Sequence, residues 1–114
     1  MHTSKSTNGT VTGVYKNFSS VEYETECGDI LTIEVSAETS KQLNFQENDN
    51  VFIDIKIDKE EADDSKVVFA NNCLAFIEYE SPIGETFSVE VDNNIFDLKN
   101  NSVVDMRIDF QIAC

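Results

Sequence analysis

The sequence predicts an all-β protein built from two tandem antiparallel β-units with one short helix. Two observations carry this prediction. Apolar and polar residues alternate over short segments, which is typical of half-buried strands because successive side chains of a strand point to opposite faces. The chain also repeats itself, since residues 21–35 read VEYETECGDILTIEV and residues 77–91 read IEYESPIGETFSVEV, without a gap.

The repeat predicts how the chain is divided. The identical residues of the first copy are Glu22, Tyr23, Glu24, Gly28, Glu34 and Val35, and they recur as Glu78, Tyr79, Glu80, Gly84, Glu90 and Val91. Downstream, residues 54–58 (DIKID) align with residues 105–109 (DMRID) after a deletion. We therefore expect a flexible N-terminus at 1–8, a first β-unit at 9–58, an acidic linker at 59–66 and a second β-unit at 67–114.

Alternation places strands within both units, each with one apolar face. In the first unit the apolar-facing sets are Val21, Tyr23 and Thr25, then Leu31, Ile33 and Val35, then Val51, Ile53, Ile55 and Ile57. In the second unit they are Phe87, Val89 and Val91, then Met106, Ile108, Phe110 and Ile112. The turn-forming segments Cys27-Gly28-Asp29 and Pro82-Ile83-Gly84 predict hairpins that join the first two strands of each unit.

One short helix is expected in the first unit, between the strand that contains Leu31, Ile33 and Val35 and the strand that begins at Val51. Ser36 is a suitable N-cap for a helix over residues 37–43, because its hydroxyl can accept a hydrogen bond from the first turn. The second unit carries Asp92-Asn93-Asn94 there, which predicts a turn. The acidic linker lacks the central glycine and distal glutamate of an EF-hand, so we expect a solvated segment and no metal site.

The charge of the chain argues against two classes of partner. Eight Lys and Arg residues face 22 Asp and Glu residues, which gives a net charge of −14. Direct binding to nucleic acid or to a membrane surface needs clustered cations, so neither is expected. The chain has no apolar run long enough to span a bilayer, and its opening residues lack the apolar stretch of a signal peptide. We therefore expect a cytoplasmic protein.

Catalysis is not expected either. The single histidine is His2, and the four glycines leave little material for phosphate-binding loops. The three cysteines, Cys27, Cys73 and Cys114, are an odd number without a Cys-x-x-Cys spacing, which fits neither a disulfide framework nor a zinc site. The sequence thus predicts a binding protein without a metal or cofactor.

The order of features in residues 31–56 resembles a known family. A strand ends in Ser36, a short helix follows, and then come the step Leu43-Asn44-Phe45, a turn at Asp49 and a strand ending in Ile55-Lys56. This order resembles the Mop and TOBE domains, which are OB-like β-barrels, and residues 9–14 are similar to their first strand. The resemblance covers residues 9–58 directly and residues 67–112 through the repeat, and it implies two OB-like units in tandem.

The resemblance implies a carrier or sensor of molybdate or a related oxyanion, or the regulatory barrel of an anion importer. The positions that match the ligand-facing ones of the family are Thr32, Ser36, Thr39 and Lys56. Hydroxyls, backbone N–H groups and one cation suit a tetrahedral dianion. The sequence departs from the family pattern at Ile33, where a serine is usual, and at Asn48, which replaces a turn glycine. Because such pockets often form between subunits, a homo-oligomer is a possible state.

The acidic strands support an alternative function. Glutamates occupy alternate positions of two predicted strands, and they are Glu22, Glu24 and Glu26 in the first unit and Glu78 and Glu80 in the second. Carboxylates in such a row are spaced about 6.7 Å apart and can imitate a phosphate backbone, so they could bind a basic protein partner as an inhibitor or interaction module. A simpler interpretation is that they keep the protein soluble and block edge-to-edge pairing.

Overall fold

The strands of the protein close into a single barrel. The computed structural model describes residues 2–60, 65–81 and 83–113. The strands are β1 (His2–Val14), β2 (Phe18–Glu24), β3 (Ile30–Ser36), β4 (Asn50–Asp58), β5 (Ser65–Ala70), β6 (Leu74–Glu80), β7 (Thr86–Asp92) and β8 (Val103–Ile112). The helices are α1 (Ala37–Gln42) and α2 (Asn93–Phe96).

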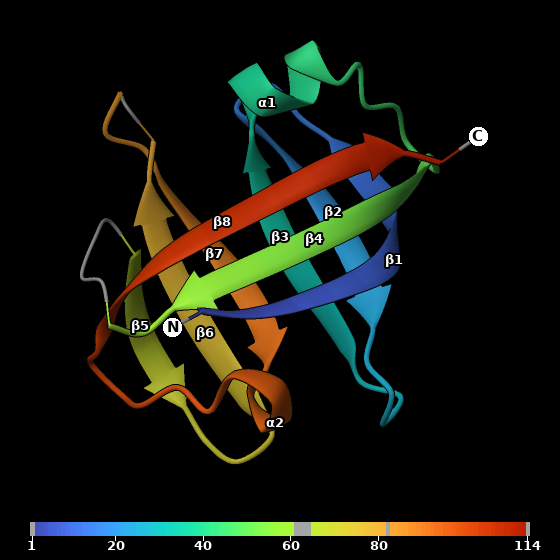
Figure 1. The fold of residues 1–114 in the computed structure, drawn as a ribbon. Coiled ribbons are helices and arrows are strands. Elements are labelled where there is room, and N and C mark those ends of the chain that lie inside the picture. The colour runs from blue at the N-terminus through green and yellow to red at the C-terminus, as the bar shows by residue number, and fades with distance from the viewer. Residues whose placement is uncertain (1, 61–64, 82, 114) are drawn as a thin grey trace.

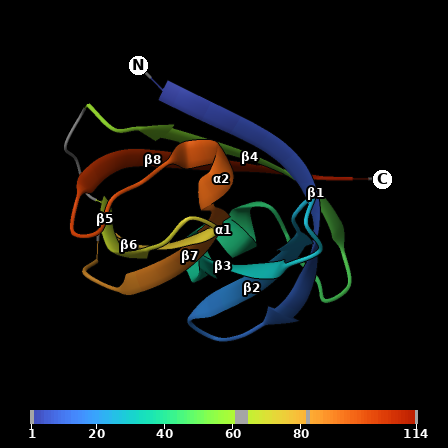
Figure 2. The ribbon, with the colours of Figure 1, turned by 90° about the horizontal axis from the view of Figure 1, so that it is seen from below.

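Every pair of neighbouring strands is antiparallel, and the order around the barrel is β1-β2-β3-β7-β6-β5-β8-β4. The all-β prediction is therefore confirmed. Figure 1 shows β4 and β8 crossing the molecule side by side, with α1 and α2 at opposite ends. Seen from below in Figure 2, β4 and β8 form one layer over β2, β3, β6 and β7.

The predicted apolar faces line the interior of the barrel. Ile53, Ile55 and Ile57 of β4 are each 1% exposed, and most other members of the predicted apolar sets are buried as well. The set on β8 differs, because Met106, Ile108, Phe110 and Ile112 are only partly buried against the core. Strand β8 is therefore less covered than β4 beside it.

The predicted helix is present, and so are the turns at Gly28 and Gly84, although Pro82 of the second turn lies outside the described residues. Gly28 and Gly84 take positive φ values of 90° and 86° in the β2–β3 and β6–β7 turns, where a side chain would be strained. Ser36 caps α1, because its side chain accepts a hydrogen bond from the backbone N–H of Thr39. The expected turn at residues 92–94 is instead the start of α2, since Asp92 caps a helical turn by accepting from the N–H of Asn94.

Two predicted boundaries need correction. We expected residues 1–8 to be a flexible terminus, but residues 2–10 pair with β4 in a continuous antiparallel register from His2↔Asp58 to Thr10↔Asn50. The acidic linker was expected to reach residue 66, but Ser65 and Lys66 already pair with β8 as the start of β5. Its residues 61–64 lie outside the described part of the chain.

The contact between β3 and β7 joins equivalent positions of the repeat. These strands pair only at Ile33↔Val89, two residues that are 56 positions apart. The bulge between Val11 and Gly13 in β1 also has a counterpart 56 positions later, between Val67 and Phe69 in β5. The seam between β3 and β7 therefore lies close to an approximate two-fold axis.

The same relation continues across β4 and β8, with a shorter spacing. Asn48 and Asn101 both have positive φ, and their N–H groups donate to the oxygens of Val11 and Val67. Asn48 and Asn101 are 53 positions apart, and in the pairing of β4 with β8 the residues Ile55 and Ile108 have the same separation. The structure thus shifts the expected alignment of residues 54–58 with residues 105–109 by two positions.

Candidate functional site

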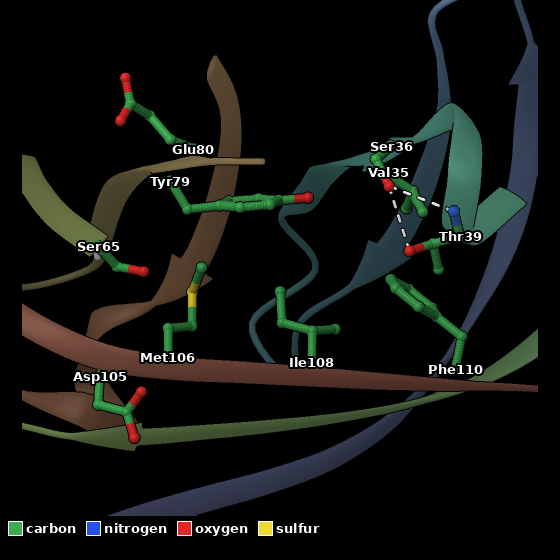
Figure 3. Close-up of a pocket in the computed structure, with 10 residues that line it drawn as sticks. All are labelled: Val35, Ser36, Thr39, Ser65, Tyr79, Glu80, Asp105, Met106, Ile108 and Phe110. Carbon is green, nitrogen blue, oxygen red and sulfur yellow. Dashed lines mark hydrogen bonds between the residues drawn. The ribbon is translucent and has the colours of Figure 1, made fainter. Parts of the chain in front are cut away.

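A groove opens along one side of β8, facing the end of β3 and the start of α1. Its volume is about 200 Å³. Figure 3 shows the side chains around it. The lining residues are Val35 and Ser36 of β3, Thr39 of α1, Ser65 of β5, Tyr79 and Glu80 of β6, and Asp105, Met106, Ile108 and Phe110 of β8.

The floor of the groove is apolar. Met106, Ile108 and Phe110 rise from β8 toward Tyr79 and toward the Ser36–Thr39 pair (Figure 3). Phe110 packs edge-on against the buried ring of Phe45, with ring centroids 5.7 Å apart. These three side chains alternate along β8 because residues two apart share a face of a strand. They remain half-buried because the groove lies open above them.

Hydroxyl groups surround this floor. The Ser36 hydroxyl donates to Thr39 Oγ1 at 3.1 Å, and Thr39 N donates back to Ser36 Oγ at 3.3 Å. Tyr79 donates its hydroxyl proton to the backbone oxygen of Glu34 at 2.8 Å. Burial, assisted by the Glu34 carboxylate, raises the pKa of Tyr79 to about 12. Tyr79 therefore stays a neutral hydroxyl at any physiological pH.

The charged residues at the groove are acidic. Glu80 and Asp105 lie at its rim, and their carboxylates point away from the Tyr79 ring in Figure 3. No Lys or Arg lines the groove within the described residues. In a chain with a net charge of −14, this environment favours a neutral or positively charged ligand over an anion.

The four predicted oxyanion ligands do not meet at one place. Ser36 and Thr39 lie together at the groove, as described above. Thr32 lies on the outer face of β3, and its backbone N–H already donates to Glu90 Oε1 at 2.7 Å. Lys56 is exposed on the outer face of β4.

Lys56 lies in a row of alternating charges. Its cross-strand partner on β8 is Arg107, and the neighbouring pairs on the same face are Asp54↔Asp109 and Asp58↔Asp105. Carboxylates directly beside two cations reduce the local positive potential. The Lys56–Arg107 pair is therefore a mixed-charge part of the sheet surface rather than a ready anion site.

The glutamates of the alternative hypothesis share one surface but do not form a single row. Glu22 and Glu24 are exposed on β2, and Glu78 and Glu80 are exposed on β6, with β3 and β7 between them. Glu26 lies in the β2–β3 turn, where its carboxylate is 3.2 Å from Lys5 Nζ.

Two further glutamates lie between these strands and have an internal role. Glu34 Oε1 accepts hydrogen bonds from the backbone N–H of Ser88 at 2.7 Å and from its hydroxyl at 3.1 Å. Glu90 Oε1 accepts a hydrogen bond from the backbone N–H of Thr32. Each of the two carboxylates therefore accepts from a backbone N–H of the opposite strand across the seam. The sequence did carry a signal for this role, because Glu34 and Glu90 occupy the same polar position in the two copies of the repeat.

Side chains that could form a metal centre are not grouped in the parts of the chain that the structure covers. Within them, no group of three or more His, Cys, Asp or Glu side chains could hold a metal ion. Cys27 and Cys73 are exposed thiols in turns. Among the described helices, none is long and apolar enough to cross a membrane.

Similarity to known proteins is found among solved structures. No family model matches the chain, and no curated protein matches it. Among solved structures, the chain is similar to the cytoplasmic molybdate-binding protein ModG in a crystal form with molybdate bound. The match covers 96% of each chain, with 13% sequence identity and a TM-score of 0.38. An identity and a TM-score this low do not establish a shared ligand.

Proposed function

We propose that the protein is a non-catalytic binding protein and that the groove beside β8 is its binding site. The observation that carries this proposal is the combination of an apolar floor, made by Met106, Ile108 and Phe110, with the hydroxyls of Ser36, Thr39 and Tyr79. Ligand sites typically pair an apolar surface with a few polar groups that fix orientation.

A positively charged polypeptide segment is the first candidate ligand. The rim of the groove carries Glu80 and Asp105, and the exposed glutamates of β6 continue the negative surface beyond it. Such a potential speeds the encounter with a basic partner and disfavours an acidic one. The proposal thus retains the basic protein partner of the sequence hypothesis, with the groove as the site in place of the glutamate rows.

A small oxyanion is the second candidate, favoured by the hydroxyls of Ser36 and Thr39 and by the resemblance to Mop and TOBE domains. Neither Lys56 nor Arg107 lines the groove, so the cation that a dianion needs would have to come from a second subunit. An oxyanion site at this groove therefore predicts an oligomer.

Isothermal titration calorimetry separates the two candidates. The protein is titrated with molybdate, with tungstate, with sulfate and with a short lysine-containing peptide, each at low and moderate salt. Saturable heat with the peptide alone supports the first candidate. Saturable heat with an oxyanion that is lost in Thr39→Val supports the second. Flat titrations with every probe would reject the groove as a site for either class.

A further inference from the structure

Beyond Val104, one edge of β8 has no strand beside it in the described part of the chain. On its other edge, β8 pairs with β4 along its length from Asp105 to Ile112. On the groove side, β5 pairs with β8 only at Val103 and Val104. Within the described residues, no strand pairs with β8 beyond Val104 on this side, and the groove runs along that stretch.

The backbone groups at this edge can be identified from the hydrogen-bond pattern. Ala113 N donates to Asn50 O at 2.8 Å, so residue 113 directs its backbone groups toward β4. In an antiparallel sheet, alternate residues direct their N–H and C=O groups to opposite sides of the strand. The backbone groups of Met106, Ile108 and Phe110 therefore point toward the groove.

Strand β4 shows what these positions look like when a strand covers them. The counterparts of Met106, Ile108 and Phe110, 53 positions earlier, are Ile53, Ile55 and Ile57. They pair with Thr7, Lys5 and Thr3 of β1, and each of them is 1% exposed. The N-terminal half of β1 thus covers on β4 the edge that β8 leaves open.

The cavity under β1 corresponds to the groove. It has a volume of about 60 Å³, and its lining includes Tyr23, Glu24 and Ile55. These residues are the counterparts of Tyr79, Glu80 and Ile108 in the groove, whose volume is about 200 Å³. Lys5 and Thr7 of β1 line the smaller cavity and do not line the groove. The groove therefore has the same construction as the cavity, without a covering strand.

We propose that the open edge of β8 binds an extended basic segment of a partner protein by strand addition. The segment would run antiparallel to β8, bond to the backbone of Met106, Ile108 and Phe110, and close the groove as β1 closes the cavity beside β4. This proposal rests on the proposed function, because the segment would occupy the same groove. Strand addition of this kind obtains affinity from main-chain hydrogen bonds and specificity from alternate side chains.

The covering strand of the first cavity indicates the chemistry of the segment. Residues 3–7 of β1 read TSKST, and the half-buried positions among them are Thr3, Lys5 and Thr7. Lys5 reaches the carboxylate of Glu26 beside the cavity. The counterpart of Glu26 in the repeat is Pro82, so the carboxylates available to a cation at the groove are those of Glu80 and Asp105. A Lys or Arg flanked by small polar residues therefore fits the inward positions of an added strand.

A synthetic peptide with the sequence of residues 3–9, TSKSTNG, is a direct probe of the edge. Fluorescence anisotropy of the labelled peptide with the full chain measures binding. One matched peptide is N-methylated at its lysine, which removes a backbone donor that faces the β8 edge, and a second is N-methylated at the serine before it, whose N–H faces away. We expect the first modification to weaken binding about tenfold or more and the second to have little effect.

The location of binding is read by amide NMR on the ¹⁵N-labelled protein. The expected result is that the peptide shifts and protects the amides of Met106, Ile108 and Phe110. Changes in the chemical shifts of the Ile53, Ile55 and Ile57 amides instead, which already pair with β1, would mean that the peptide displaces β1, and this overturns the proposal.

Further outcomes separate strand addition from the proposed function. Equal binding of both N-methylated peptides, with amide shifts at other groove residues such as Ser36 and Thr39 but no protection of the three β8 amides, overturns strand addition and leaves the groove as a binding site. Absence of any shift at the groove with the peptide and with molybdate overturns both. A dimer of the protein alone, with the three β8 amides already protected, shows that a second copy covers the edge and also overturns the proposal.

Discussion

The hydroxyl of Tyr23 donates to the backbone oxygen of Glu90 at 2.6 Å, across the seam between β3 and β7. Tyr79 makes the equivalent bond to the oxygen of Glu34 at 2.8 Å. Strands β3 and β7 share only one register pair. The tyrosine hydrogen bonds, together with those that Glu34 and Glu90 accept, therefore hold much of the seam. The barrel therefore closes here through side chains that recur in the repeat.

We predict that Tyr23→Phe and Tyr79→Phe each destabilise the protein. Each change removes one hydrogen bond and leaves the packing of the ring unchanged, so the expected loss is about 1 kcal/mol. Urea unfolding followed by circular dichroism measures it. Tyr15→Phe is the matched control, because Tyr15 is 56% exposed. A loss in the control equal to that of the seam variants would show that the seam bonds contribute nothing specific.

The same tyrosines predict a loss of stability at alkaline pH. Burial raises the pKa of Tyr79 from 10.0 to about 12, and burial also raises the pKa of Tyr23. A raised pKa means that the folded state favours the protonated hydroxyl, so this contribution to stability is complete below pH 10 and is lost as pH rises toward 12. We expect the free energy of unfolding to fall over this range. Tyr79→Phe should reduce the slope, and an unchanged slope in Tyr79→Phe would contradict the assignment.

Ser36 allows its capping role to be separated from a role in ligand binding. Ser36→Ala removes the N-cap of α1 and should cost about 1 kcal/mol of stability. Ser36→Asp keeps a capping oxygen and adds a negative charge at the groove, so stability should be retained. In the aspartate variant, oxyanion binding should disappear and binding of a basic peptide should persist or strengthen. Calorimetry with molybdate and with the peptide tests both points, and unchanged oxyanion binding would remove Ser36 from the site.

Local chemistry made much of the fold predictable. The alternating segments, the turn glycines and the serine cap act over a few residues, and the corresponding strands, turns and α1 were found as expected. Residues 2–8 could not be assigned in this way, because HTSKSTN has no apolar alternation and becomes a strand by pairing with the edge of β4. We infer that the two halves arose from one duplicated unit, since the seam contacts and bulges recur at a constant spacing.

The candidate site was less predictable than the fold. Ser36 and Thr39 were identified because a helix cap leaves a local signature. The groove itself depends on missing strand pairing, because in the described part of the chain β5 pairs with β8 at two positions while β1 pairs with β4 at nine. The sequence of β8 does not predict that its edge lacks a neighbour, because Met106, Ile108 and Phe110 alternate with polar residues as buried side chains of a covered strand do. Their partial exposure follows only from long-range pairing.

Gly9 is required where β1 passes between two strands. It pairs with Tyr23 of β2 and with Val51 of β4. A Cβ atom at this position would lie 2.8 Å from the backbone oxygen of Glu22 and 2.6 Å from Ile53 Cδ1. Because a backbone atom cannot move aside as a side chain can, we predict that Gly9→Ala costs about 1–3 kcal/mol, as overpacked cores do.

Gly13→Ala is the matched control for this prediction. Gly13 lies in the same strand, but the three atoms nearest to a Cβ there all belong to the Tyr15 side chain, which is exposed and can move. Urea unfolding should therefore show a much smaller loss for Gly13→Ala than for Gly9→Ala. Similar losses in the two variants would mean that the β1 backbone yields at Gly9, and that the crossing of β1 between β2 and β4 does not depend on the missing side chain.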